Sequence, residues 1–179
     1  METLRKDHQV SSIVREIAND YRHFDRGALA VMATEIATIP HLRRLVSNFG
    51  NKKLHPKRPT ILLCRQPTTY LLGWREGEGT GVHDHGQAEV GINVICGQIT
   101  EDLYATVPEE NNSRRVLLAF SRQLLAGQTI TCPANYIHRF RNVFPEVCAT
   151  LHVYGPKLSK MSSWDDKVTS LKFVSHWEA

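Results

Sequence analysis

Two histidines separated by one residue are the feature of this sequence that most directly suggests chemistry. His83-Asp84-His85 follows a turn punctuated by glycines and stands at the start of a β-rich run. In an extended chain the side chains at positions i and i+2 lie on the same face, so both imidazoles can point into one cavity. Two such imidazoles make half of a metal site, and the remaining ligands must come from elsewhere in the chain.

A third histidine stands in a later block that has its own spacing. The first block, residues 77–97, holds both of these histidines and Glu89, and the second, residues 127–142, holds His138. The pair resembles the two cupin motifs, G-x5-H-x-H-x3-E-x6-G and G-x5-P-x-G-x2-H-x3-N. The first block is one residue longer than its motif. Asn135 replaces the glycine of the second, and asparagine also tolerates the left-handed turn conformation.

The cupin resemblance implies a mainly β fold, a double-stranded β-helix or jelly-roll barrel. It implies that His83, His85 and His138 converge on one metal ion, with Glu89 as a candidate fourth ligand. Neutral imidazoles bind iron, nickel, copper and zinc with little discrimination. Three protein ligands leave positions open for a substrate and O₂, which favours Fe(2+) as the cofactor, with zinc as the alternative.

A third block, residues 149–156, narrows the family. Every second residue from Ala149 is apolar, and the residues between are Thr150, His152 and Tyr154. This polar face either meets solvent or is buried with hydrogen-bond partners, because burial without them is costly. The block resembles the S-x-H-x-Y-S-P-P segment of the cysteine dioxygenase family, with threonine in place of serine. In that family the three side chains form a relay beside the iron, which implies catalytic roles for Thr150, His152 and Tyr154.

Two further positions bear on the substrate and on a cross-link. The family binds the substrate carboxylate with an arginine upstream of the histidine pair, and counting back from Trp74 reaches Lys57, with Arg58 adjacent. Both basic residues are candidates, and Trp74 either lines the pocket or belongs to the core. Some family members join a cysteine to the active-site tyrosine. That position holds Val90 here, so we expect no cross-link.

The elements that must position these residues fall into two regions of one predicted cupin domain, 1–179. Residues 1–50 form a helical segment, because an apolar stripe with a 3.6-residue period runs from Val10 to Tyr21 and helical patterns follow at 27–38 and 42–49. Residues 57–179 form the barrel and tail, because short β-rich runs alternate with turns. The predicted strands are 60–64, 69–74, 89–95, 98–104, 115–121, 128–132, 136–141, 148–154 and 171–174.

Composition argues against several other classes of protein. The net charge of +4 comes from 22 basic and 18 acidic residues that are interspersed, so no nucleic-acid surface is predicted. No apolar run approaches the roughly 20 residues of a membrane span. The first residues lack the apolar core of a signal peptide, so a cytoplasmic protein is expected. Four separated cysteines without a CxxC pair argue against a zinc ribbon or a disulfide framework.

These features together predict a thiol dioxygenase that uses O₂ to oxidise a small thiol, such as cysteine or 3-mercaptopropionate, to its sulfinic acid. We expect a monomer or a small homo-oligomer. One alternative is another cupin enzyme, a dioxygenase, decarboxylase or isomerase with Glu89 as fourth ligand. The other is a non-catalytic cupin that binds a metal or a small ligand. The relay from Thr150 to Tyr154 favours the first hypothesis, because neither alternative needs it.

Overall fold

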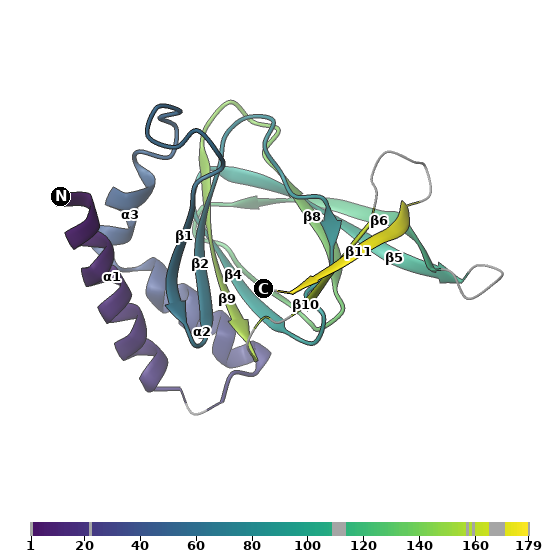
Figure 1. Ribbon diagram of the computed structural model, residues 1–179, viewed down its shortest axis with the longest axis horizontal. Coiled ribbons are helices and arrows are strands. Elements are labelled where there is room, and N and C mark those ends of the chain that lie inside the picture. Colours follow the sequence, from purple (N-terminus) through teal and green to yellow (C-terminus); the bar gives the residue numbers. More distant parts are fainter. Residues whose placement is uncertain are drawn as a thin grey trace.

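Three helices precede the β structure and lie together on one side of it (Figure 1). The computed structural model describes residues 2–21, 23–108, 114–156, 158, 160–164 and 171–178. The helices are α1 (Glu2–Asn19), α2 (Arg26–Ala37) and α3 (Pro40–Val46). Helix α2 begins after Asp25, whose carboxylate accepts a hydrogen bond from the Ala28 N–H at 2.9 Å and so caps the helix. The helical N-terminal segment is therefore confirmed.

Two antiparallel sheets hold the strands that follow the helices. The first has the strand order β1-β2-β9-β4-β7; the second runs β10-β11-β6-β5-β8-β3 and closes because β3 pairs with β10. The strands are β1 (Thr60–Arg65), β2 (Thr68–Trp74), β3 (Val82–His83), β4 (Glu89–Cys96), β5 (Gln98–Pro108), β6 (Arg114–Leu125), β7 (Thr129–Cys132), β8 (Ile137–Arg141), β9 (Cys148–Gly155), β10 (Lys160–Trp164) and β11 (Leu171–Glu178). The mainly β, cupin-type fold class is confirmed.

The sequence pattern missed two strands and shortened three others, among them β11, which was predicted only as 171–174. Strand β3 has only two residues, too few to show a period of two, and β10 reads Lys-Met-Ser-Ser-Trp, with none of the β-branched residues that mark strands. Strands β5 and β6 extend well beyond the predicted 98–104 and 115–121. They pair with each other along their whole length, and that long-range pairing leaves no local signal.

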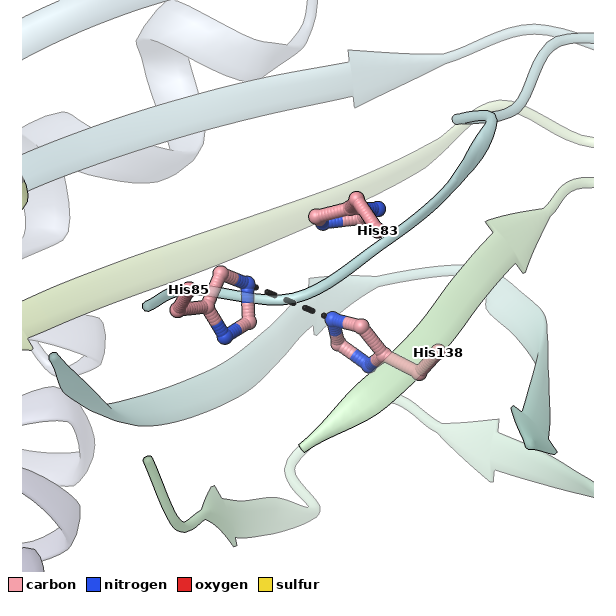
Figure 2. A group of neighbouring side chains, drawn as sticks. All are labelled: His83, His85 and His138. Atoms are coloured by element: carbon pink, nitrogen blue, oxygen red, sulfur yellow. Dashed lines mark hydrogen bonds between the residues drawn. The ribbon is translucent and has the colours of Figure 1, made fainter. Parts of the chain in front are cut away.

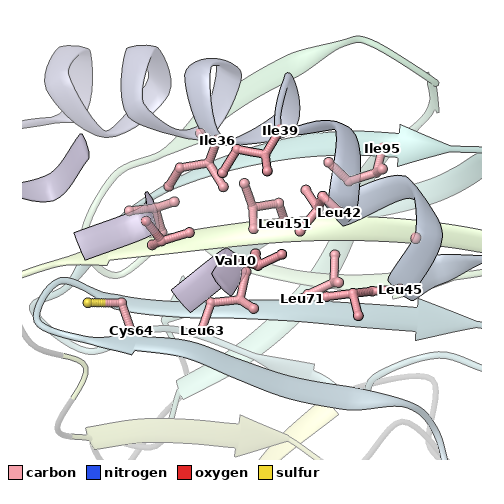
Figure 3. Close-up of a cluster of buried hydrophobic side chains, with 14 of the residues drawn as sticks. Val10, Ile36, Ile39, Leu42, Leu45, Leu63, Cys64, Leu71, Ile95 and Leu151 are labelled. Atoms are coloured by element: carbon pink, nitrogen blue, oxygen red, sulfur yellow. The ribbon is translucent and has the colours of Figure 1, made fainter. Parts of the chain in front are cut away.

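The helices cover the outer face of the first sheet. Val10 of α1, Ile36 of α2 and Leu42 of α3 pack with Leu71 and Leu151 in one buried cluster (Figure 3). Burial of side chains of this size stabilises the fold by about 1.5–3 kcal/mol each. No helix among the described residues is both long and apolar enough to cross a membrane.

The contact between α2 and β4 depends on one glycine. A Cβ atom at Gly91 would lie 2.3 Å from the carbonyl oxygen of Leu29, so any larger residue would push the helix away from the sheet.

Strand β9 is buried on both faces. Leu151 and Val153 belong to the cluster beneath the helices, whereas Tyr154 belongs to a second cluster inside the barrel. Thr150 and His152 are also buried. The alternative in which this polar face meets solvent is therefore wrong, and hydrogen-bond partners must be found for it inside the protein.

Candidate metal centre

Backbone pairing brings the separated histidines together. His83 of β3 and His138 of β8 are direct cross-strand partners. The second block reaches the first through Asn135, whose N–H donates to the carbonyl of Gly86 at 2.9 Å. Asn135 has φ +62°, so the position at which cupins place glycine does adopt the left-handed conformation predicted for it.

The three imidazoles form one buried cluster (Figure 2). Their ring centroids lie 4.9–5.1 Å apart, and one ligand nitrogen from each lies within 4.8 Å of the others. His83 Nδ1 lies 2.9 Å from the carbonyl oxygen of Gly81, which leaves its Nε2 free. Nε2 of His85 and Nε2 of His138 face each other at 3.3 Å. The cluster can therefore present three nitrogen lone pairs to one point.

The electrostatics of the cluster suit a cation. Burial lowers the pKa of His83, and burial together with neighbouring imidazoles lowers the pKa of His85 and His138 well below its ordinary value. Neutral rings present lone pairs, and lone pairs that face each other repel unless a cation or a proton lies between them. The Nδ1 of His85 is buried and has no partner among the described residues. These donors fit a transition metal bound by three histidines.

A chain of hydrogen bonds leads to the cluster from β2. Trp74 Nε1 donates to Thr150 Oγ1 at 2.8 Å, and Thr150 Oγ1 lies 2.9 Å from His152 Nε2. His152 Nδ1 lies 3.3 Å from the hydroxyl of Tyr154, whose ring centroid is 5.4 Å from that of His85. These are the partners that the buried polar face requires. Trp74 is a buried interior residue and the first donor in this series of hydrogen bonds.

The protonation states in this chain follow from burial. Burial raises the pKa of Tyr154 and lowers that of His152 well below its ordinary value. The phenol is therefore protonated and the imidazole neutral near pH 7. If Thr150, which accepts from Trp74, donates to Nε2 of His152, then Nδ1–H donates to Tyr154 and the phenolic proton is free to point elsewhere.

The structure distinguishes the two basic candidates. The Arg58 guanidinium lies 4.6 Å above the ring of Trp74 and donates to the carbonyl of Gly79 at 3.2 Å. A cavity of about 380 Å³ lies between Arg58 and His83, with Met161 of β10 on its wall. Lys57 is exposed and is not among the residues that line this cavity.

Glu89 lies away from the histidine cluster. Its carboxylate is 3.4 Å from Nε of Arg26 on α2. Along β4, Val90 and Ile92 belong to the interior cluster, whereas Gly91 contacts α2, so Glu89 alternates onto the helix side. This position argues against the prediction that Glu89 is a fourth ligand.

Another carboxylate, which the sequence analysis missed, does contact the cluster. Glu101 of β5 is fully buried, and its Oε1 lies 2.7 Å from Nδ1 of His138. Burial raises the pKa of Glu101, and the guanidinium of Arg122 opposes that rise. The adjacent acids Glu101-Asp102 in a predicted strand were the only available signal, and a pair of acids does not by itself indicate which one faces inward.

Comparison with known proteins identifies the family. The family model described as "Cysteine dioxygenase type I" matches residues 62–167, more than half of the chain. This chain belongs to the cysteine dioxygenase type I family. It is 25% identical over 100 residues to cysteine dioxygenase type 1 of Bos taurus, and 25% identical over 99 residues to that of Homo sapiens. Each comparison covers 54% of this chain and 48% of the relative, so the chain spans about half the length of these curated relatives.

Among solved structures, one similar chain is a conserved protein with a double-stranded β-helix domain from Klebsiella pneumoniae. It has a TM-score of 0.47 and 16% identity, and the comparison covers 60% of this chain and 77% of that one.

Within this member of the cysteine dioxygenase family, strand register pairs Val90 directly with Tyr154. The residue that faces the tyrosine across the sheet therefore has no sulfur with which to form a thioether.

Proposed function

We propose that this chain is a non-haem iron thiol dioxygenase that converts a small thiol bearing a carboxylate, such as cysteine or 3-mercaptopropionate, into its sulfinic acid. The observation that carries the proposal is the hydrogen-bonded chain that ends at Tyr154, against His85 of the three-histidine cluster. A metal-binding protein without catalysis would not need a buried phenol at that place. The cytoplasmic location and the oligomeric state stay predictions.

The overall reaction inserts both atoms of O₂ into one thiol, RSH + O₂ → RSO₂H, so sulfur loses four electrons and O₂ gains them. His83, His85 and His138 would hold Fe(2+) through their Nε2 atoms. Bound iron would favour the deprotonated thiol and supply the redox chemistry with O₂.

The remaining residues of the site bind, orient and protonate. Arg58 would bind the substrate carboxylate, because its guanidinium is half-buried and lies beside the cavity at His83. Tyr154 would donate a hydrogen bond toward the reacting atoms, because its pKa is raised and its oxygen would accept from Nδ1–H of His152, 3.3 Å away. Trp74 and Thr150 orient His152 so that the phenolic proton points into the site rather than back along the chain.

Oxygen uptake measured with the Fe(2+)-loaded protein and a panel of thiols tests the function. We expect cysteine or 3-mercaptopropionate to be consumed with one O₂ per thiol and to yield a sulfinate. Cysteamine, which lacks a carboxylate, should react more slowly. Anaerobic addition of the preferred thiol should perturb the spectrum of the iron. Absence of both uptake and perturbation with every thiol would refute the proposal.

Replacing Tyr154 with Phe should slow turnover while leaving iron bound. Loss of a positioned proton donor typically costs about 100-fold or more in rate. The measurement is kcat together with iron content per chain. Tyr70→Phe is a matched control, because that ring packs 6.4 Å from Tyr154 and its hydroxyl has no hydrogen bond to the described residues. Unchanged turnover in Tyr154→Phe would remove the relay from the mechanism.

A further inference from the structure

The three histidines of the cluster differ in what their Nδ1 atoms contact. His83 Nδ1 contacts a backbone carbonyl, and His85 Nδ1 has no partner among the described residues. His138 Nδ1 is the exception, because it lies 2.7 Å from a carboxylate oxygen, Oε1 of Glu101. Of the three rings, His138 alone therefore has a charged acceptor for its second nitrogen within this part of the protein.

The position of Glu101 is determined by strands on both sides. On β6, Arg122 is its direct cross-strand partner, and both Nε and Nη2 of Arg122 lie 2.6 Å from Oε2. On β8, His138 is a diagonal neighbour, because Glu101 pairs with Phe140. One oxygen thus faces the guanidinium and the other faces the imidazole. A carboxylate held in this way cannot rotate out to solvent, because its side chain is fully buried.

We propose that Glu101, anchored by Arg122, is a positioning residue that sets the tautomer and the ring orientation of His138; this inference rests on the proposed metal site. By accepting the Nδ1 proton, Glu101 leaves a lone pair on Nε2, the atom that faces His85. Turning the ring over would exchange Nδ1 for a carbon and leave Oε1 of a buried anion with only the weak Cys132 thiol donor, whose sulfur lies 4.0 Å away. The carboxylate also makes the imidazole a stronger donor to a metal.

A different role for Glu101 is that of a direct ligand in a second metal site. Glu101, Cys132 and His138 lie close enough together to hold an ion. However, the Arg122 guanidinium already pairs with the Glu101 carboxylate, with Nη2 2.6 Å from Oε2. A metal ion bound to this carboxylate would be repelled by that positive charge. The geometry therefore favours orientation of one metal ligand over a second metal.

Nitrogen-15 NMR of histidine-labelled protein reads the tautomer directly, with and without Zn²⁺. We expect His138 of the wild-type protein to carry its proton on Nδ1 before any metal is added. In Glu101→Gln this preference should be lost, because the amide can itself donate to Nδ1. Zn²⁺ affinity, measured by competition with a chelator, should fall by about 10- to 100-fold. Glu101→Asp retains the charge at a shorter reach, and we expect a smaller loss from it.

Asp102→Asn is the matched control, because Asp102 is equally buried one residue later and pairs instead with Arg139 and Arg141, each at 2.7 Å. It should lower the melting temperature but leave the His138 tautomer and Zn²⁺ affinity unchanged. The inference is overturned if folded Glu101→Gln keeps the wild-type tautomer and affinity, or if Glu101→Asp loses more affinity than Glu101→Gln. It is also overturned if the wild-type protein binds two Zn²⁺ and Glu101→Gln binds one. Wild-type protein that binds no metal would refute the proposed function, while the metal-free tautomer would still test this inference.

Discussion

Replacing His85 with Ala is expected to abolish metal binding and reduce thiol-dependent oxygen uptake to background. His85 is fully inside the protein, and its Nε2 faces Nε2 of His138 at 3.3 Å. Its removal leaves two imidazoles and a cavity where the third stood. The loss of affinity should exceed the roughly 100-fold that removal of an outer partner costs. Metal content after dialysis against a chelator, measured on folded protein, checks the prediction.

Glu89→Ala is the natural control for this experiment. The residue stands four positions later, where cupin motifs place a ligand, but its carboxylate pairs with Arg26. We expect full metal content and an unchanged rate. Wild-type metal content in His85→Ala would remove the histidine cluster from the proposal. A large loss of metal in Glu89→Ala would instead return this carboxylate to the coordination sphere and favour another type of cupin enzyme.

Arg58→Ala should lower kcat/KM selectively for thiols that carry a carboxylate. A hydrogen bond to a charged group contributes about 1.5–3 kcal/mol, which corresponds to roughly 10- to 150-fold in rate. The kcat/KM for cysteamine should change little, because cysteamine has no carboxylate for Arg58 to bind. The measurement is the ratio of kcat/KM for 3-mercaptopropionate and cysteamine in each variant.

Lys57→Ala is the matched control, since Lys57 is the exposed neighbour of Arg58. We expect the substrate ratio to be unchanged in that variant. If kcat/KM for the carboxylate-bearing thiols fell in Lys57→Ala and not in Arg58→Ala, the substrate would bind outside the cavity beside His83. An equal loss for both classes of thiol in Arg58→Ala would indicate that Arg58 supports Trp74 rather than contacting the substrate.

Local strand geometry was sufficient to predict which side chains of one strand share a face, whereas the approach of His138 to His83 was implied only by the resemblance to the cupin motifs. The i, i+2 rule puts His83 beside His85 and puts Thr150, His152 and Tyr154 on one face of β9. The left-handed conformation of Asn135 followed from a motif position. The shared strand faces require only neighbouring residues and a known period of two.

Cross-strand register is what the sequence could not provide. Glu101 contacts Arg122 and His138 because β5 pairs with both β6 and β8, and no local pattern encodes that pairing. The same limit applies to Glu89, whose motif position suggested coordination. Its direction depends on which face of β4 meets α2. Which of Lys57 and Arg58 lines the cavity at His83 likewise depends on how the loop before β1 is placed in space.

The alternation along β9 also makes the N-terminal helices part of the support for the hydrogen-bonded side chains that end at Tyr154. Leu151 and Val153 anchor this strand beneath α1–α3, while the side chains between them form the relay. The family match begins only at residue 62. A shortened protein that started there would expose the outer face of its central sheet to water. In a barrel isolated without these helices, we therefore expect the Tyr154 hydroxyl to lose its position before the histidine cluster is disrupted.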